Sequence, residues 1–165
     1  EMSGGLVGSE MCIRDSTNRI DKSMIELSVE PGSYSSSGFS NDNKYFFFIT
    51  DVGEEFSYLV KYEIETGKEE VLFQTNWDVM YSYLSESEKY RVTAVNEDGK
   101  NTLFIKNLVN NSDVFFPAIP DGDIKGVRIS KSEKKIRLTV GTSKSPNNIY
   151  VYDICLLYTS DAADE

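Results

Sequence analysis

The chain has 165 residues, of which 27 are acidic, 17 are basic and none is histidine, and its net charge at pH 7 is −10. This acidic balance gives no basic footprint for nucleic acid, so we expect no nucleic-acid partner. The longest apolar runs, such as residues 45–49, are of strand length and too short to span a bilayer, so no membrane segment is predicted.

The two ends of the chain do not look like natural protein. Residues 6–16 and 155–165 resemble translations of the transposon-type adapters used in sequencing libraries. Residues 11–16 can be encoded by ATGTGTATAAGAGACAG, and the reverse complement of that stretch, read in another frame, encodes the Cys-Leu-Leu-Tyr-Thr of residues 155–159. We therefore interpret residues 1–16 and 155–165 as adapter-derived tails, which leaves residues 17–154 as the natural segment.

Three short phrases recur at an even spacing, at residues 40–44 (SNDNK), 85–89 (SESEK) and 130–134 (SKSEK). Each runs into an apolar, β-branched or aromatic stretch. A repeat of roughly 40–50 residues made of short strands and turns is typical of β-propeller blades. The sequence therefore predicts an all-β fold, a partial β-propeller of about three four-stranded antiparallel blades with a repeat of 45 residues. We place these blades at about residues 33–73, 77–119 and 123–154.

In the first repeat, the small residues at 33–40 predict an inner strand, and residues 44–50 predict a fully buried central strand. Residues 56–64 alternate toward one face, as a half-buried strand does. The turn at residues 65–68 contains a glycine that is free to adopt positive φ. The charged run at 69–73 predicts an edge strand, where charges discourage unwanted pairing.

The second repeat follows the same plan, with strands predicted at residues 77–84, 90–95, 101–108 and 114–119 and turns at 96–99 and 110–113. Asp98-Gly99, between two such runs, is the strongest hairpin signal in the chain. The third repeat has strands predicted at residues 123–130, 135–140 and 148–154, and it ends where a fourth strand should begin. No stretch carries a helical period with caps, so essentially no helix is expected.

The natural segment lacks the residues that common reactions need. Without histidine no Ser-His-Asp triad can form, and both cysteines, Cys12 and Cys155, lie in the tails. There is no Gly-x-Ser-x-Gly elbow, no P-loop and no metal-binding cluster of His or Cys. We therefore expect no catalytic residue, no metal and no cofactor in this segment.

Two acidic features suggest a binding site. Glu54 and Glu55 could hold the amino terminus of a substrate by charge, although solvated acids are ordinary in a loop between strands, so they are weak candidates for substrate binding. Asp121 and Asp123 around Gly122 suggest a calcium loop but lack the remaining ligands and the terminal Glu of that pattern. We favour a plain turn at this second position.

Two further features have ordinary explanations. Trp77, Tyr81 and Tyr83 could form a stacking platform, but strand aromatics spaced by two more often fill the core between blades. Residues 110–112 match a glycosylation acceptor, a pattern so short that chance explains it.

The amino-acid sequences of the repeats resemble those of a known family. WDVMYSYLSESEKYRVTAVNEDGKNTLFIKNL (residues 77–108) and IPDGDIKGVRISKSEKKIRLTVGTSKSPNNIYVYDI (residues 119–154) are similar to the N-terminal propeller of prolyl oligopeptidase family serine peptidases. Residues 49–73 resemble the blade that precedes them. In such propellers the blade turn usually has the sequence Ser-Pro-Asp-Gly-Lys. Every copy in this chain keeps the Ser and the Lys but lacks the Pro and the Gly.

The resemblance implies a parent enzyme in which this propeller covers an α/β-hydrolase domain that carries the Ser, Asp and His. The function it implies is a non-catalytic propeller segment that gates the access of peptides to a hydrolase domain absent from this chain, with peptide substrates as partners through that domain. The alternative is a non-catalytic propeller that binds protein partners, such as a Tol-like periplasmic module. The compartment stays open between the cytoplasm and the periplasm of a prokaryote.

Overall fold

The computed structural model describes Leu27 and residues 30–115, 122–142 and 146–154. The chain divides into two units, Glu1–Glu30 and Pro31–Glu165, and all the strands assigned within the described residues belong to the second. The predicted adapter tails, residues 1–16 and 155–165, lie outside the described residues.

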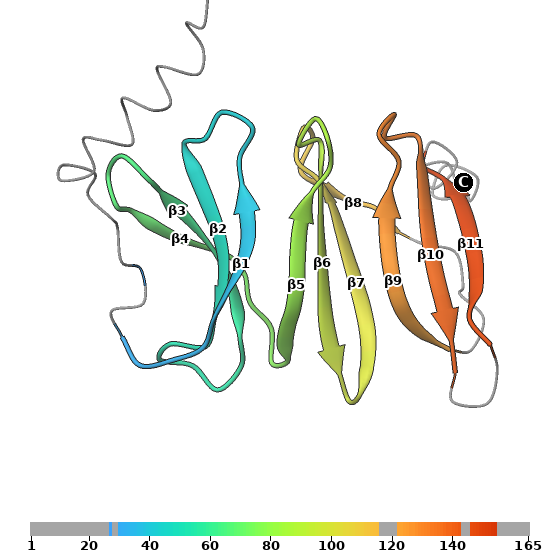
Figure 1. Ribbon diagram of the computed structural model, residues 1–165, viewed down its shortest axis with the longest axis horizontal. Helices are drawn as coiled ribbons and strands as arrows, with labels where there is room; N and C mark the ends of the chain where they lie inside the picture. The colour runs from blue at the N-terminus through green and yellow to red at the C-terminus, as the bar shows by residue number, and fades with distance from the viewer. Residues whose placement is uncertain (1–26, 28–29, 116–121, 143–145, 155–165) are drawn as a thin grey trace, which may run out of the picture. The chain divides into compact units, whose positions relative to one another are not determined.

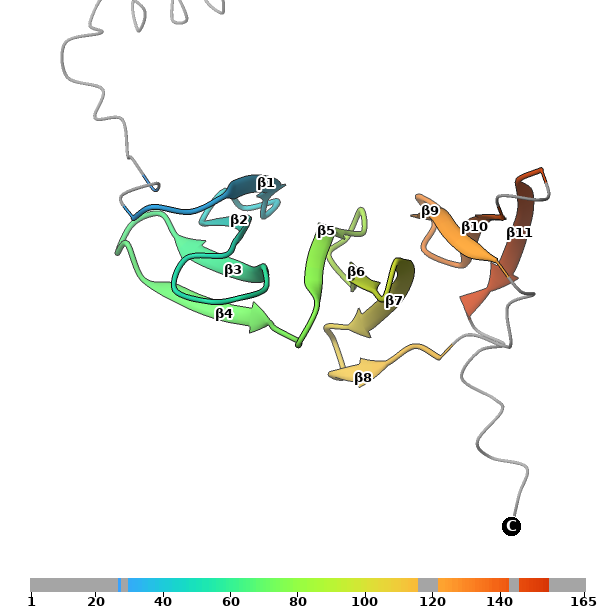
Figure 2. The same ribbon diagram turned by 90° about the horizontal axis from the view of Figure 1, so that it is seen from below.

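The described residues contain eleven strands in three antiparallel sheets, and within each sheet every strand pairs with the next along the chain (Figure 1). Sheet 1 contains β1 (Tyr34–Phe39), β2 (Tyr45–Thr50), β3 (Tyr58–Glu63) and β4 (Glu69–Phe73). Sheet 2 contains β5 (Asp78–Leu84), β6 (Tyr90–Glu97), β7 (Lys100–Asn107) and β8 (Ser112–Asp113). Sheet 3 contains β9 (Asp123–Ile129), β10 (Lys135–Gly141) and β11 (Asn148–Asp153). Figure 2 shows the three sheets one after another in chain order, which confirms the predicted all-β repeat of blade-like sheets.

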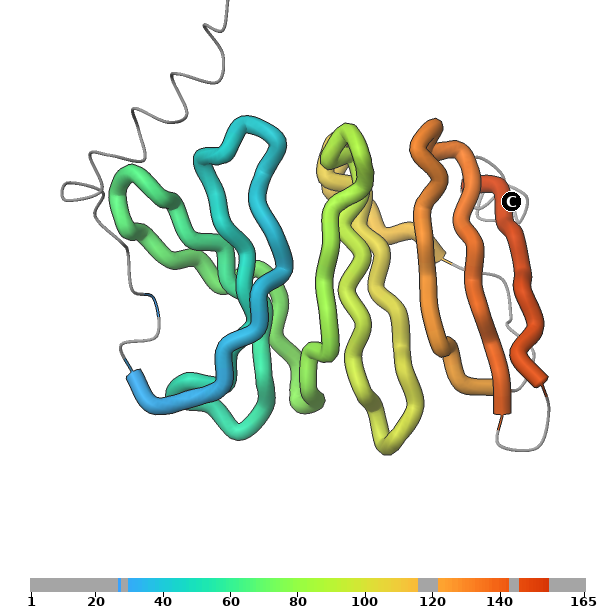
Figure 3. Tube along the Cα trace, in the orientation of Figure 1, coloured from blue at the N-terminus to red at the C-terminus, as the bar shows by residue number. Residues whose placement is uncertain are grey.

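The serine phrases are the turns that join the first two strands of each sheet. In the first turn, the Ser40 amide donates to the Tyr45 carbonyl over 2.9 Å, and the Tyr45 amide donates to the Ser40 hydroxyl over 3.0 Å. The same two bonds recur between Ser85 and Tyr90, and between Ser130 and Lys135. The Cα trace in Figure 3 follows the chain through the three turns, which stand at the same end of the sheets.

The fourth residue of every serine turn has positive φ. The angle is 57° at Asn43, 61° at Glu88 and 56° at Glu133. A non-glycine residue pays a steric cost of about 1–2 kcal/mol in this left-handed region. The serine hydroxyl and the paired backbone bonds stabilise the turn against this cost, which explains how the phrase works without the usual Pro and Gly.

The hairpin predicted at Asp98-Gly99 is confirmed. The two residues have φ of 48° and 77°, the positive pair that defines a type I′ turn, and Glu97 pairs with Lys100 across it. This turn matches the right-handed twist of the strands it joins.

Two predicted strands need correction. The fourth strand of sheet 2, predicted at residues 114–119 after a turn at 110–113, already begins at Ser112. The Ser112 amide and hydroxyl both donate to the Asn110 side chain, over 3.1 and 2.8 Å, and Asn111 has φ of 59°, so the chain reverses early. Residues 116–119 of the predicted strand lie outside the described part of the chain.

Strand β2 was expected to be fully buried, and only part of it is. Phe48, Ile49 and Thr50 are buried, whereas Tyr45, Phe46 and Phe47 are half-buried. The buried half lies at the end of the strand farther from the serine turn, and the other half lies next to that turn.

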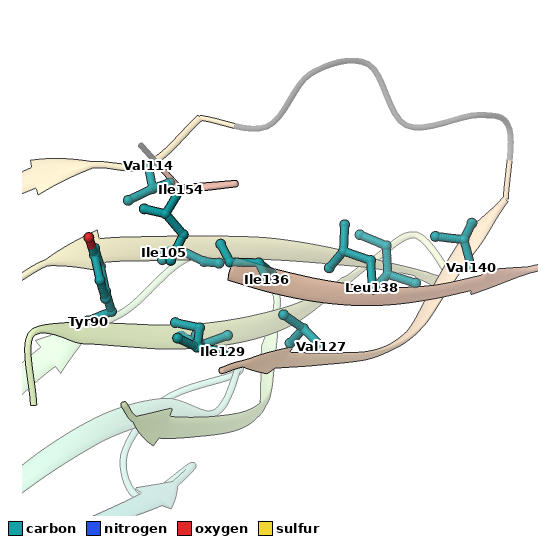
Figure 4. Close-up of a cluster of buried hydrophobic side chains, with 11 residues drawn as sticks. Tyr90, Ile105, Val114, Val127, Ile129, Ile136, Leu138, Val140 and Ile154 are labelled. Carbon is teal, nitrogen blue, oxygen red and sulfur yellow. The ribbon is translucent and has the colours of Figure 1, made fainter. Parts of the chain in front are cut away.

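The hydrophobic core lies between the sheets, and it is divided unequally. Eleven buried side chains form one cluster between sheets 2 and 3, shown in part in Figure 4: Tyr90, Val92, Ile105, Val114, Ile124, Val127, Ile129, Ile136, Leu138, Val140 and Ile154. Only four form the cluster between sheets 1 and 2: Ile49, Leu59, Val79 and Val95. Alternate residues of β6 serve the two clusters, so this central strand is buried on both faces.

Polar side chains link neighbouring sheets at the serine-turn end. The Asn41 amide donates to the Glu88 carboxylate, and the Asn41 side chain donates to the Glu86 carbonyl over 2.9 Å. One repeat later, the Ser87 amide and hydroxyl donate to the Glu133 carboxylate over 2.7 and 2.6 Å. The first and second serine turns are therefore each held to the following turn by the glutamate at the positive-φ position of that following turn.

A second set of links joins the sheets at the opposite end. The Ser57 amide donates to the Asp78 carboxylate over 3.1 Å, and the Asn101 amide donates to the Asp123 carboxylate over 2.8 Å. Ser57 directly precedes β3 and Asn101 is the second residue of β7, the third strands of their sheets, and each aspartate begins the next sheet. Neighbouring sheets are thus tied at both ends by the same repeated chemistry.

Candidate functional site

Two cavities lie between sheets 1 and 2. The first, the β1–β5 cavity, has a volume of about 300 Å³, and its lining includes Ser37, Leu59, Ser82 and Arg91. The second, the β4–β7 groove, has a volume of about 520 Å³, and its lining includes Glu70, Val71, Phe73, Arg91, Phe104 and Leu108. Arg91 is common to both, so it stands at the centre of this interface.

The cavities arise because the face that sheet 2 turns toward sheet 1 is unusually polar. This face carries Ser82, Arg91 and Thr93, which alternate along their strands with residues of the larger cluster. The same repeat positions in sheet 3 are occupied by Val127, Ile136 and Leu138, all of them in the larger cluster. Small and polar side chains fill less apolar volume than Val, Ile and Leu, so the smaller cluster leaves space beside it.

Two of these polar residues satisfy one another. The Ser82 hydroxyl donates to the Val92 carbonyl over 2.9 Å and lies 3.2 Å from the Thr93 hydroxyl. In contrast, the buried Ser37 hydroxyl makes no hydrogen bond to the described residues. Ser37 is the residue skipped in the pairing of β1 with β2, where the register shifts between Ser36 and Gly38.

Arg91 carries its charge in a half-buried position. Its guanidinium donates to the Leu72 carbonyl over a long 3.4 Å, and no carboxylate of the described residues lies within ion-pair distance. Burial lowers the pKa of this guanidinium, and the charge of Glu70 partly offsets the shift. The guanidinium remains protonated at neutral pH even so, because arginine is the most basic side chain in proteins.

The other charges of the β4–β7 groove are paired. Lys61 lies 2.5 Å from the Glu70 carboxylate, and Lys106 lies 3.6 Å from that of Asp113. The attraction of Lys61, through a hydrogen bond and its charge, lowers the pKa of Glu70. Lys61 lies outside the groove lining, whose own charges are those of Glu70, Asp113, Lys106 and Arg91, and Arg91 is the one of these four with no ion pair among the described residues.

An apolar wall stands beside this charge. The rings of Phe73 and Phe104 contact each other with their centroids 5.0 Å apart, one from sheet 1 and one from sheet 2. Val71 is 53% exposed, Leu108 40% and Phe104 38%. The groove therefore combines a guanidinium that has no ion pair among the described residues with apolar surface that water still reaches.

The weak candidates Glu54 and Glu55 lie elsewhere. Both are exposed in the loop between β2 and β3, where the Glu54 amide donates to the Asp51 carbonyl over 3.1 Å. Neither lines the β1–β5 cavity or the β4–β7 groove. A role for them in substrate binding stays a prediction.

Asp123 takes part in structure. Its carboxylate accepts hydrogen bonds from the Asn101 amide and from Lys125 Nζ, over 2.8 and 2.7 Å. Burial raises the pKa of Asp123, but these hydrogen bonds and the charge of Lys125 leave it below its usual value. Asp121 lies outside the described residues, within which no group of three or more potential metal ligands occurs.

Of the three aromatic residues near β5, Tyr81 and Tyr83 pack between sheets as expected, whereas Trp77 does not. Tyr81 and Tyr83 contact the cluster between sheets 2 and 3, and the Tyr83 hydroxyl donates to the Val127 carbonyl over 3.3 Å. Burial raises the pKa of Tyr83 to about 12. Trp77 is partly exposed beside Phe56, with 6.4 Å between the ring centroids. In residues 110–112, which match the glycosylation pattern by chance, the Asn110 side chain accepts hydrogen bonds from Ser112.

Sequence reasoning missed Arg91, although a signal for it exists. When the three repeats are aligned on their serines, Arg91 falls at the position held by Phe46 and Ile136. A charged residue at a position that is apolar in both sister repeats marks a local departure from the packing rule.

No family model and no curated protein matches the chain. Among solved structures, TolB from Acinetobacter baumannii is similar with a TM-score of 0.53 and 18% identity, over 73% of this chain and 30% of that one. A protein assigned as TolB from Agrobacterium tumefaciens gives a TM-score of 0.54 and 14% identity, over 76% of this chain and 47% of that one. The three sheets resemble blades of the TolB propeller.

This likeness establishes the fold of the segment. The chain spans less than half the length of either TolB structure, so it corresponds to part of such a propeller. Membership of the prolyl oligopeptidase family is not shown by these matches. The described residues contain no helix that is long and apolar enough to cross a bilayer.

Proposed function

We propose that this chain is a segment of a non-catalytic propeller that binds protein partners, as in the Tol-like alternative. The observation that carries the proposal is the similarity of its sheets to two TolB propellers over about three quarters of the chain. The interface between sheets 1 and 2 supports it, because it offers a groove with accessible apolar side chains and a guanidinium that has no ion pair among the described residues. Surfaces with aromatic and arginine side chains are typical of protein recognition.

A second candidate is the propeller of a prolyl oligopeptidase-like serine peptidase, which would gate peptides on their way to a hydrolase domain. Its support is the blade wording of residues 77–108 and 119–154. The chain has no histidine, so any catalytic triad would have to come from another part of the parent protein. The structural matches favour the first candidate over this one.

Recovery of the complete reading frame around residues 17–154 tests the proposal. We expect further blades of the same repeat, with no Gly-x-Ser-x-Gly elbow and no downstream histidine in an α/β pattern. A strand–elbow–helix segment with that motif would overturn the non-catalytic assignment. A second test is an assay of the complete protein with a chromogenic prolyl peptide. If the proposal holds, we expect no hydrolysis above background.

A further inference from the structure

The β4–β7 groove contains a guanidinium, that of Arg91, with which no carboxylate of the described residues forms an ion pair. The two carboxylates of its lining, Glu70 and Asp113, are paired with lysines, and Arg91 keeps one long hydrogen bond to a backbone carbonyl. A guanidinium has five N–H donors in a fixed fork, so most of its capacity is unused by the described residues. Partial burial makes this arrangement costly, because a charge removed from water is stabilised only by a matched partner.

The repeat shows that this cost is not required by the fold. Phe46 and Ile136 stand at the same position in the other two repeats, and Ile136 is fully buried against sheet 2. An apolar residue at position 91 would fill the interface without a desolvated charge. Departures of this kind from local packing rules are concentrated at functional sites.

The shape and chemistry of the groove define its ligand. A carboxylate matches the planar fork of arginine with two parallel hydrogen bonds. The neighbouring Phe73–Phe104 pair and the exposed Val71 and Leu108 fit an apolar side chain. A volume of about 520 Å³ is within the range of small-ligand sites and holds a terminal residue rather than a long strand.

We propose that the β4–β7 groove binds the C-terminal carboxylate of a protein partner that ends in an apolar or aromatic residue, with Arg91 as the anchor. A chain terminus suits the site because one residue presents the carboxylate and the apolar side chain within a few bonds of each other. The identity of the ligand as a protein terminus rests on the proposed binding function. The recognition of a carboxylate next to an apolar group rests on the groove alone.

The experiment measures the binding of three small probes to the full 165-residue chain by NMR titration. The probes are N-acetyl-phenylalanine, its C-terminal amide, and N-acetyl-aspartyl-phenylalanine amide, which carries its carboxylate on a side chain. We expect the first to bind at least tenfold more tightly than the second, and more tightly than the third. Equal binding of the acid and the amide would refute the proposal, and tighter binding of the third would replace the chain terminus by an internal acidic residue.

Variants test the role of Arg91 directly. Arg91→Met keeps much of the apolar stem and removes the charge, so we expect at least a tenfold loss of binding to N-acetyl-phenylalanine. Arg137→Met is the matched control, because Arg137 is exposed on β10 and lines neither cavity, and its binding should be unchanged. Unchanged binding of Arg91→Met would overturn the proposal.

A measurement on the unmodified chain covers the case in which Arg91→Met does not fold. Phenylglyoxal modifies accessible arginines, and the extent at each site can be read by peptide mass spectrometry. N-acetyl-phenylalanine should protect Arg91 at least severalfold and leave Arg137 unprotected, and absence of protection would refute the site. Failure of these tests would not touch the proposed propeller function, which stands or falls on the complete reading frame.

Discussion

The unequal division of the core makes a quantitative prediction for two leucines. Leu138 and Leu59 are both fully buried, but Leu138 belongs to the eleven-residue cluster, whereas Leu59 belongs to the four-residue cluster and lines the β1–β5 cavity. Replacement of either by alanine loses about 2.4 kcal/mol of transfer free energy, at about 0.8 kcal/mol per methylene equivalent. For Leu138→Ala, an enclosed void of about 60–80 Å³ adds about 1.5–2 kcal/mol. The expected loss of unfolding free energy is therefore about 4 kcal/mol.

For Leu59→Ala the second contribution should nearly vanish, because the new space joins an existing cavity that water and side chains can enter. We expect a loss of about 2.5 kcal/mol, so the two variants should differ by about 1.5 kcal/mol. Urea unfolding followed by far-UV circular dichroism measures both, and the slope m should be the same for the two variants. Runs at several protein concentrations separate unfolding from association. Equal losses, or a larger loss for Leu59→Ala, would show that the division of the core does not control its energetics.

Three further predictions follow from the turns and the buried hydroxyls. Partial burial raises the pKa of Glu133, but hydrogen bonds from the hydroxyls of the preceding serine turn leave this pKa below 4.5. The ionised carboxylate therefore stabilises the folded state above pH 4.5, and this contribution is lost as the pH falls through the lowered pKa. Glu133→Gln should cost about 1 kcal/mol at pH 7 and flatten the acid limb of a stability–pH curve. Gly99→Ala should lower stability by about 1–2 kcal/mol because φ is 77° there, whereas Gly126→Ala, which has open space around it and no positive φ, should be close to neutral in the same urea titration. In a spectrophotometric titration, one tyrosinate should form only near pH 12, and Tyr83→Phe should remove it; a curve that is unchanged by Tyr83→Phe would be the contrary result.

The turns were predictable from the sequence because their chemistry is local. The serine phrases recur at residues 40, 85 and 130, and in each the hydroxyl, the backbone bonds and the positive φ lie within six consecutive residues. Asp98-Gly99 was readable for the same reason, since the type I′ turn depends on two residues alone. The early start of β8 was not readable, because the stretch from Asn110 to Ser112 has turn chemistry that does not by itself set where pairing resumes.

The candidate site was not predictable in the same way, because it depends on which faces meet. Glu54 and Glu55 stood out as adjacent charges, yet both lie in an exposed loop away from the cavities. Arg91 is an ordinary residue in a strand of alternating character when it is read alone. Its significance appears only when sheet 1 and sheet 2 are placed together, and when Phe46 and Ile136 are compared at the same repeat position.

The two sets of links at the sheet ends explain why polar residues open a space rather than collapse the interface. Asn41–Glu88 and Ser57–Asp78 hold sheets 1 and 2 at both ends, as Ser87–Glu133 and Asn101–Asp123 hold sheets 2 and 3. Both pairs of neighbouring sheets are joined at their ends by hydrogen bonds to carboxylates, so their ends stay in contact whichever side chains lie between the sheets. Large apolar residues then fill the interior between sheets 2 and 3, while Ser82, Arg91 and Thr93 leave that between sheets 1 and 2 partly empty. The constant ends thus allow one interface to hold the larger apolar core and the other to keep the open groove for which binding is proposed.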